Sequence, residues 1–407
     1  MTASTIDVVT VTSFADAKDA YRQKDLRQAL YDEGEVVMAD VLVNLHGTEH
    51  RDRRRVENRS FRRDTFDLYE RELFPAVTDR TLAPYLAAGR VDLVHLGHEL
   101  MLNLAALTAG VDRPQGTAEE TGRLYDYTML FIEGATLAHS TQDKDERRQA
   151  IGEALVAWDE EFLTPSIRRR QEALARLEAG EIDETGVPRD VLTTLLRSAG
   201  ELHLPHEVIR REAAFLLLAG AHTSATAFVR SIDHILSWVE EHPEDAAKVA
   251  GDRLFVQRCI HETVRLNPSS PVAQRWALSD VTLKSGVHIP QGGKLVIDLA
   301  AVNRDPEVFG PDAADFDPYR ALPQGVGPFG LSFGGGMHVC IGQDLAAGVV
   351  PAGDVDPDAH LYGLVTGAVQ RMFNEGVRRD PENPPQRDTH TARPYWGTYP
   401  VLLGRGE

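Results

Sequence analysis

The sequence predicts a mainly α-helical protein with minor β-sheets. Helical patterns of apolar residues run through residues 66–110 and 119–178, and a longer one covers residues 205–241. Segments typical of strands lie at the two ends of the chain, at residues 6–12 and 396–403, where β-branched and aromatic side chains are frequent. Helices should therefore form the body of the protein, with sheets as its smaller parts.

The chain shows no boundary between domains. Its length of 407 residues would by itself suggest about two or three domains. No Ser/Gly-rich linker, low-complexity tract or internal repeat divides the sequence, and 42% hydrophobic with 26% charged residues is an ordinary globular composition. We therefore expect residues 1–407 to form a single domain.

The negative net charge argues against two classes of binding partner. A formal net charge of −19 argues against non-specific binding to nucleic acids and to anionic membranes, because both are negatively charged. Two Cys residues cannot form a disulfide framework, and nothing at the N-terminus resembles a signal peptide or a long apolar run. We expect a cytoplasmic protein with no nucleic-acid partner and no membrane insertion.

The N-terminal half begins with short elements and continues with longer helices. Residues 6–12 suit a strand, and Ser13 is placed to cap a helix that extends to about Leu30. A second apolar stretch follows at residues 36–45. The later helices should end at Gly110, because glycine readily adopts the left-handed conformation that terminates a helix.

The longest predicted element is a helix over residues 205–241. Pro205 suits its first turn, and the pair His242-Pro243 marks its end. At ~1.5 Å per residue such a helix crosses the whole molecule. Its centre, residues 215–224, is nearly all apolar, so we expect it to be buried.

The C-terminal part contains an interrupted helix. A helix should begin after Cys340, but Pro351 and its neighbours within residues 349–358 interrupt it, because proline and glycine destabilise a helix interior. Helical periodicity resumes at residues 360–375. A terminal strand at residues 396–403 completes the chain.

A glycine-rich loop around Cys340 is the most informative stretch. It reads F-G-G-G-M-H-V-C-I-G from Phe333 to Gly342. The glycines allow the backbone to approach a flat ligand closely, and N–H groups at the start of a helix can point at the sulfur. Such a setting stabilises a thiolate, and a Cys thiolate is one of the known axial ligands of haem iron.

Two other interpretations of this loop compete. A single Cys is more often a buried core thiol than a ligand. Residues 330–334 also match G-x-S-x-G, in which Ser332 would be the nucleophile of an α/β-hydrolase. That motif follows a central strand, whereas residues 323–328 are rich in proline and glycine and predict turns. The hydrolase is therefore a remote alternative.

The loop resembles the signature of the cytochrome P450 family, F-x-x-G-x-[HR]-x-C-x-G. All of its fixed positions are matched, by Phe333, Gly336, His338, Cys340 and Gly342. The resemblance implies the P450 fold and a haem-thiolate monooxygenase, with Cys340 as the axial ligand of haem b. Such an enzyme inserts one oxygen atom from O2 into a small hydrophobic or amphipathic substrate. Its electrons come from NAD(P)H through a ferredoxin reductase and a ferredoxin.

A basic segment near residue 50 resembles the third helix of the family. His50 and Arg54 are one turn apart and share a helical face, and in the family such a pair holds a haem propionate. The resemblance assigns Arg275 and His338 to the propionates as well. A solvated basic face is the alternative, because a run of charges is most often exposed.

The same segment forms a positive patch on a negative protein. A patch of this kind suits an acidic electron-transfer partner such as ferredoxin. The arginines that we expect to steer this partner are Arg53, Arg55, Arg59, Arg62 and Arg63.

The centre of the long helix resembles the distal helix of the family, where A-G-x-[DE]-T lies over the iron. Ala219, Gly220 and Thr223 match this pattern, and His222 replaces the acidic residue. We predict that Ala219 and Gly220 lie against the haem and that Thr223 and His222 are catalytic residues that deliver protons. Alternatively, His222 binds substrate, or both residues are hydrogen-bonded within the core.

A further set of motifs supports the resemblance, which covers roughly residue 40 to the end. Glu262 and Arg265 match the family's E-x-x-R, and Arg320 should complete this structural lock. Cys259 is expected to be a core thiol. The family usually carries more residues before its third helix, so we expect a shortened N-terminal β region.

Other functions also use a haem-thiolate. A haem sensor would keep Cys340 without needing a distal Thr or an electron donor. A peroxygenase or an isomerase would use haem without a redox partner. Product formation that depends on NAD(P)H separates a monooxygenase from all three.

Overall fold

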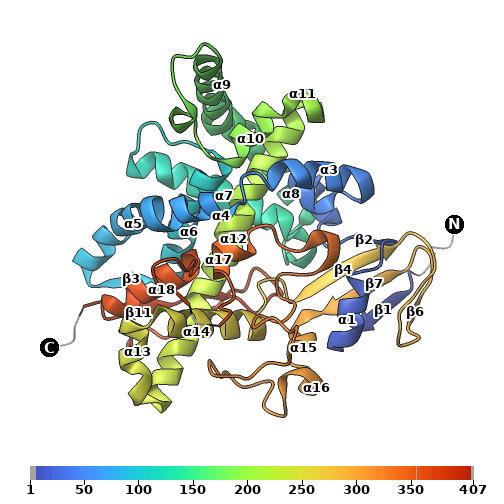
Figure 1. Cartoon of the computed structure of the whole chain (residues 1–407), viewed down its shortest axis with the longest axis vertical. Helices are drawn as coiled ribbons and strands as arrows, with labels where there is room; N and C mark the ends of the chain where they lie inside the picture. The colour runs from blue at the N-terminus through green and yellow to red at the C-terminus, as the bar shows by residue number, and fades with distance from the viewer. Residues whose placement is uncertain (1–5, 354, 405–407) are drawn as a thin grey trace.

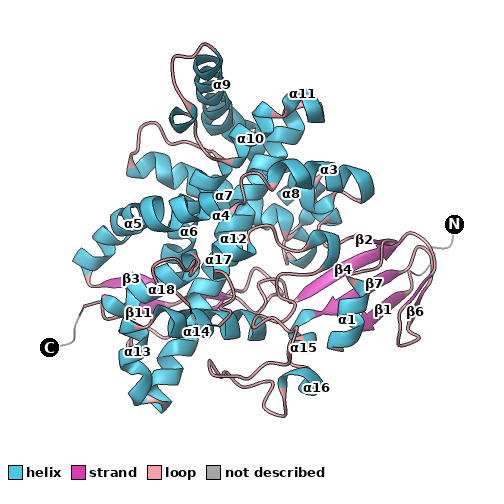
Figure 2. Ribbon diagram, in the orientation of Figure 1, coloured by secondary structure: helices cyan, strands magenta, loops and turns pink. Residues whose placement is uncertain are grey.

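The computed structural model describes residues 6–353 and 355–404, most of which lie in helices (Figure 1). Strands, drawn in magenta in Figure 2, gather at two sides of the helical body. The mainly α fold class predicted from the sequence is confirmed. The longer helices are α3 (Gly47–Glu57), α5 (Phe74–Ala88), α6 (Leu93–Ala109), α7 (Ala118–Ala135), α8 (Lys144–Trp158), α9 (Thr164–Glu178), α12 (His206–Glu241), α14 (Arg253–Leu266) and α18 (Leu364–Asn374).

Shorter helices connect these elements. They are α1 (Phe14–Ala20), α2 (Glu35–Met38), α4 (Arg63–Leu68), α10 (Val191–Arg197), α11 (Ala199–Leu202), α13 (Ala246–Gly251), α15 (Leu299–Val302), α16 (Pro306–Phe309) and α17 (Gln343–Ala347).

The largest sheet has four strands and joins distant parts of the chain. Its order is β1 (Val8–Val11), β7 (Lys294–Asp298), β4 (Val272–Ala277) and β2 (Leu26–Gln28). β1 runs parallel to β7, and the other two pairs are antiparallel. The small β-domain that the short N-terminal region put in doubt is therefore present, with β1 and β2 as its edges.

The first predicted helix is shorter than expected. Ser13 does cap it, since its hydroxyl accepts a hydrogen bond from the backbone N–H of Asp16 (3.2 Å). The helix ends at Ala20 rather than near Leu30. The reason is long-range, because Leu26 is buried by the pairing of β2 with β4.

Three smaller sheets complete the fold of the described residues. Their strands are β3 (Arg90–Asp92), β11 (Pro400–Leu402) and β8 (Arg378–Arg379), then β9 (Gln386–Arg387) with β10 (Trp396–Thr398), and β5 (Val281–Thr282) with β6 (His288–Ile289). The single terminal strand predicted for residues 396–403 is wrong, because β10 and β11 belong to different sheets. Tyr399 between them is fully buried, and its hydroxyl bonds the carboxylate of Asp233.

Helix α12 is the axis of the fold, as predicted, and packs along α6 (Figure 1). Its length and composition would suffice to cross a membrane, with a mean hydropathy of 1.3 over its most apolar window. Because 61% of that window is buried inside the protein, α12 has the character of a core helix.

The predicted break after Cys340 is present and is tied to the helical body. Helix α17 ends at Ala347, and α18 begins at Leu364. The Gln257 amide donates to the carbonyls of Ala347 and Val349 (both 3.1 Å). Helix α14 therefore holds the first residues of this interruption in place.

Candidate functional site

The Cys loop, residues 333–342, presents its thiol to solvent. The backbone N–H of Cys340 donates to the carbonyl of Phe333 (2.9 Å), which closes the loop. Cys340 is exposed, although the surrounding protein is close enough to raise the pKa of its thiol. The N–H of Gly342 and the charge of Arg54 act in the opposite direction and favour the thiolate.

The glycines of the Cys loop have a role that the sequence did not reveal. Gly336 has a φ of +63°, and a Cβ built there would overlap the carbonyl oxygen of Tyr21. Gly335 also packs against the Tyr21 ring. These two glycines are therefore required where the loop contacts the end of α1.

The hydrolase interpretation of Ser332 is wrong. Turns rather than a strand precede it, and no helix follows directly. Its hydroxyl donates to the carbonyl of Val264 (2.7 Å) and accepts from the amide of Asn303 (2.8 Å). Ser332 is a structural residue that joins the Cys loop to α14.

The distal stripe, Ala219, Gly220 and Thr223, lies on α12. Thr223 is exposed and the other two are half-buried, in the middle of a helix that is otherwise largely buried. The Thr223 hydroxyl donates to the Ala219 carbonyl (2.7 Å). A Cβ on Gly220 would come within 2.9 Å of the Ala105 side chain, so this glycine allows α6 to pack closely.

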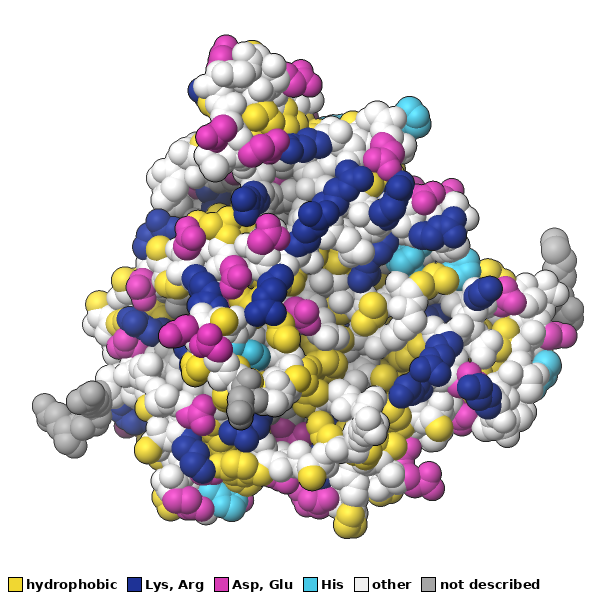
Figure 3. All heavy atoms as spheres, in the orientation of Figure 1, with side chains coloured by type: hydrophobic (Ala, Val, Ile, Leu, Met, Phe, Trp, Pro, Cys, Tyr) yellow, Lys and Arg dark blue, Asp and Glu magenta, His cyan; other side chains and the backbone are white. Residues whose placement is uncertain are grey.

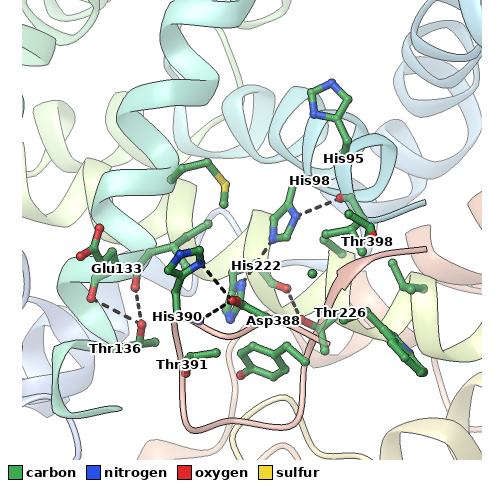
Figure 4. A pocket seen from close by; sticks show the side chains of 18 of the residues that line it. His95, His98, Glu133, Thr136, His222, Thr226, Asp388, His390, Thr391 and Thr398 are labelled. Atoms are coloured by element: carbon green, nitrogen blue, oxygen red, sulfur yellow. Dashed lines mark hydrogen bonds and ion pairs between the residues drawn. The ribbon is translucent and has the colours of Figure 1, made fainter. Parts of the chain in front are cut away.

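His222 faces away from this stripe. Its Nδ1 lies 3.4 Å from Nε2 of His98 on α6, and its ring meets the ring of Tyr395 edge-on. Both histidines line a cavity of about 870 Å³ between α6, α7, α12 and the β9–β10 hairpin (Figure 4). Burial, followed by the charges of His98 and Arg393, lowers the pKa of His222 well below its ordinary value.

Two histidines and two arginines gather beside the Cys loop. The rings of His50 and His338 are 4.3 Å apart, and the Nε2 atom of each is buried without a partner among the described residues. Burial lowers the pKa of His50 to about 4 and of His338 to about 3, with nearby positive charges adding to the effect. Arg54 donates to the Val339 carbonyl (2.8 Å).

Arg275 is buried without a carboxylate partner in the described chain. Its guanidinium donates to the side chain of Gln28 and to the carbonyl of Gln274. The Tyr21 ring lies 5.3 Å from it. A buried positive charge with only neutral partners is unusual, since charges in protein interiors are normally paired.

The E-x-x-R pair and Arg320 are in contact. Arg265, which is fully buried, forms two hydrogen bonds with Glu262 (2.6 and 2.7 Å), and Arg320 Nε donates to the same carboxylate (3.0 Å). Arg265 also reaches the carbonyls of Asn303 and Ala313. Each charge in this group is therefore hydrogen-bonded.

The basic patch differs from the prediction at one position. Arg53 is buried and forms an ion pair with Glu212 of α12 (2.8 Å), so its inclusion among the partner-steering arginines is wrong. Arg55 and Arg59 share Glu201 (2.6 and 3.6 Å). Figure 3 shows Lys and Arg side chains gathered over α3 and α4 on the face in view.

The comparisons with known proteins agree on one family. A family model described as Cytochrome P450 matches residues 153–348. Pulcherriminic acid synthase of Bacillus subtilis is 27% identical over 355 residues, which cover 84% of this chain and 80% of that protein. The chain belongs to the cytochrome P450 family.

Other P450 relatives match different lengths of this chain. Cytochrome P450 734A4 of Oryza sativa is 25% identical over 382 residues, or 82% of this chain and 68% of that protein. The P450 monooxygenase himC of Aspergillus japonicus is 30% identical over 160 residues, but these cover only 34% of this chain and 29% of that protein. Family membership makes this chain a P450 monooxygenase and implies a haem cofactor.

Solved P450 structures share the fold. A structure of P450BioI in complex with an acyl carrier protein ligated to hexadec-9Z-enoic acid has a TM-score of 0.72 and 18% identity, and covers 97% of this chain and 91% of that chain. The structure of CalO2 also has a TM-score of 0.72, with 19% identity and coverages of 98% and 91%. At these identities the likeness supports the fold alone.

Proposed function

We propose that residues 1–407 form one haem-thiolate monooxygenase domain. In this proposal Cys340 ligates the iron of haem b, and the enzyme inserts one oxygen atom from O2 into a small hydrophobic or amphipathic substrate. The observation that carries it is an exposed thiol at the signature position of a P450, beside the N–H of Gly342 and the charge of Arg54, which oppose the rise that burial causes in its pKa.

The surrounding residues suit haem. Tyr31 lies within the electrostatic reach of Arg275 and of Cys340. Burial raises the pKa of Tyr31, the charges of Arg393 and Arg275 lower it, and the charge of Cys340 raises it. The unpaired Nε2 atoms of His50 and His338 and the uncompensated charge of Arg275 match what two propionates would require. When bound, haem would supply the chemistry of O2 activation.

The chain's own residues would orient substrate and move protons. The exposed Thr223 hydroxyl would donate into the space beside the distal stripe by giving up its hydrogen bond to the Ala219 carbonyl. His222, neutral at physiological pH, would receive protons through His98 from the 870 Å³ cavity and pass them on through water. This arrangement would replace the acid that the family carries at the position of His222.

Electrons would come from NAD(P)H through a ferredoxin reductase and a ferredoxin in the cytoplasm. Arg55, Arg59, Arg62 and Arg63 are exposed, and they follow Arg54, which bonds the Cys loop. They would attract an acidic partner. P450BioI has been seen with an acyl carrier protein. We nevertheless propose a ferredoxin here, because the family generally uses redox partners.

The test is the spectrum of the reduced protein with CO. Wild type should absorb at the position typical of a haem-thiolate, and Cys340→Ala should lose this band. Cys259→Ala is a matched control, since that thiol is buried in the core on α14. A normal spectrum in Cys340→Ala would disprove the ligation. Product formation without NAD(P)H would point instead to a peroxygenase or an isomerase, and haem binding without turnover to a sensor.

A further inference from the structure

Six arginines of the described chain are more than nine-tenths buried. Three of them, Arg53, Arg170 and Arg265, bond a carboxylate at 2.6–2.8 Å. The other three have no carboxylate within 4.0 Å among the described residues. They are Arg230, Arg275 and Arg393. Because an unpaired buried charge is costly, each of these three calls for an explanation.

Arg393 is the least satisfied of the three. Arg230 donates to the carbonyls of Asn267 and Pro394, and Arg275 donates to Gln28 and to a carbonyl. The only side-chain hydrogen bond of Arg393 in the described chain runs from Nη1 to the Tyr395 hydroxyl (2.9 Å), and its Nε is buried without a partner. A guanidinium has five N–H donors, so most of its capacity is open.

The backbone around Arg393 is held firmly. The N–H of Ala392 donates to the carbonyl of His139 (3.2 Å), and Thr391 pairs with Ser140 in a β-bridge. These contacts join the hairpin loop, residues 388–395, to the connection between α7 and α8. The position of Arg393 is therefore fixed by the fold rather than by a charged partner.

Two further side chains within the electrostatic reach of Arg393 have hydrogen-bonding atoms without a partner among the described residues. Its charge acts on Tyr31, whose hydroxyl has no partner among the described residues, and on His139, whose Nε2 is buried and unpaired. The nearby acids are already engaged. Glu33, which acts on His139, bonds Lys144 (2.5 Å), and Asp388 lies 3.4 Å from His390 within the hairpin loop.

Arg393 lies close to Thr223, which is one of the predicted catalytic residues. The Tyr395 hydroxyl donates to the carbonyl of Ser269 (2.5 Å), and the Ser269 hydroxyl donates to the carbonyl of Thr223 (3.1 Å). Arg393 is thus connected to the distal stripe through two residues. On the same helix, Phe215 and Leu216 are half-buried and leave apolar surface accessible.

We propose that Arg393 binds the carboxylate of the substrate, assisted by the Tyr31 hydroxyl and His139 Nε2. The substrate would be a monocarboxylic acid with an apolar body that extends from Arg393 towards Thr223. This rests on the proposed function, since it assigns a ligand class to that site. A single guanidinium matches a monoanion, whereas a phosphate dianion would keep an excess negative charge.

A haem propionate is the other possible source of a carboxylate. The four residues His50, Arg54, Arg275 and His338 already provide the donors expected for the propionates. The experiment separates the two sources, because losing a propionate contact weakens haem retention, whereas losing a substrate contact weakens the binding of acids only.

The test uses titration calorimetry of the haem-loaded protein with unbranched carboxylic acids and with the alcohols of the same chain length. Wild type should bind at least one acid more tightly than its alcohol. Arg393→Gln should weaken the binding of that acid by about 10- to 100-fold, as expected for the loss of charge-assisted hydrogen bonds. The affinity for the alcohol should stay nearly unchanged. Arg393→Lys should retain part of the preference, and Tyr31→Phe should lose part of it.

Control measurements keep the outcomes distinct. Arg378→Gln, at an exposed position of β8, should leave the affinity for the acid and for the alcohol unchanged. Haem content and thermal unfolding show whether each variant is intact. The proposal is overturned if no acid is preferred over its alcohol, if Arg393→Gln keeps the preference, or if Arg393→Gln loses haem while acid binding persists. Failure of haem ligation by Cys340 would appear in the CO spectrum and leave calorimetric acid binding in place.

Discussion

Thr223 and His222 are adjacent on α12, yet their side chains make contacts in different directions. The Thr223 hydroxyl bonds the Ala219 carbonyl (2.7 Å), whereas His222 Nδ1 lies 3.4 Å from His98 Nε2 at the 870 Å³ cavity. A helix with about 3.6 residues per turn separates neighbouring side chains in this way. A proton relay that uses both residues therefore needs water between them.

The relay predicts that His222→Ala will still bind substrate but lose coupling. Electrons would then leave as hydrogen peroxide, because protons arrive too slowly for productive turnover. Thr223→Ala should behave likewise, and His98→Ala should show part of the effect. The measurement is hydrogen peroxide released per NAD(P)H consumed.

A matched control for the relay is His95→Ala. His95 lines the same cavity near His98, but its side chain is largely exposed and does not contact His222. It should leave coupling unchanged. If His222→Ala instead abolished the substrate-induced Soret shift and kept coupling per bound substrate, His222 would belong to the substrate pocket.

Truncation of the propionate donors should weaken haem retention. Arg275→Ala removes a buried positive charge, and His50→Ala or His338→Ala removes an unpaired ring nitrogen. We expect haem transfer to apomyoglobin to accelerate by about tenfold or more for Arg275→Ala, as for the loss of a charge-assisted hydrogen bond. His288→Ala, an exposed control in β6, should transfer haem at the wild-type rate. Unchanged transfer from Arg275→Ala and Arg54→Ala would refute the assignment.

Charge reversal on α3 and the turn that follows it should slow reduction by ferredoxin. Arg59→Glu places a negative charge where an acidic partner should dock, and the wild-type rate should fall as salt rises, because the Debye length is only about 8–10 Å at 0.10–0.15 M. Stopped-flow reduction at several ionic strengths measures both effects. A rate that is insensitive to salt and to Arg59→Glu would exclude steering by this patch.

The sequence predicts local features of this P450 well and long-range ones poorly. The cap at Ser13 and the contact of Glu262 with Arg265 depend on residues three apart, so the spacing carries the information. Arg53 and Arg55 look alike in the sequence. Only the fold reveals that Glu212, 159 residues away, buries and neutralises the first.

The same limit applies to two features of the site. Gly336 matches a family pattern, but its close approach to Tyr21 depends on a contact between two distant parts of the chain. Arg393 lies in an irregular loop with no motif. A sequence cannot reveal that an arginine is buried without an acid, because both facts depend on every neighbouring element.

Breaking the lock on α14 should strongly destabilise the protein. Arg265→Met leaves Glu262 buried with one fewer partner, and removal of one member of a buried ion pair typically costs about 3–5 kcal/mol. Urea unfolding measures the loss. Arg371→Met is the matched control, because its ion pairs with Asp79 and Glu375 are partly exposed and should contribute only about 0–1 kcal/mol. Equal losses of stability in the two variants would show that burial does not determine how much these ion pairs contribute to the free energy of unfolding.

The buried pair Glu57 and Glu212 should make the stability of the protein depend on pH. Burial raises the pKa of Glu212 from its ordinary 4.5 to about 7, although Arg53 opposes the rise. Burial and the charge of Glu212 also raise the pKa of Glu57 well above its ordinary value. A carboxyl whose pKa is higher in the folded protein binds its proton more tightly there. Its contribution to stability is full below pH 4.5 and is lost as the pH rises to about 7.

Glu212→Gln removes this proton while keeping an acceptor for the N–H of Leu42 and for Arg53. Several histidines with lowered pKa values act in the opposite direction, so the difference between variant and wild type is the informative quantity. As the pH rises from 4.5 to 7, the free energy of unfolding of the variant should increase relative to that of wild type by up to about 1.4 kcal/mol per pH unit. Urea unfolding at successive pH values measures this slope, and parallel curves would mean that Glu212 does not carry the proton.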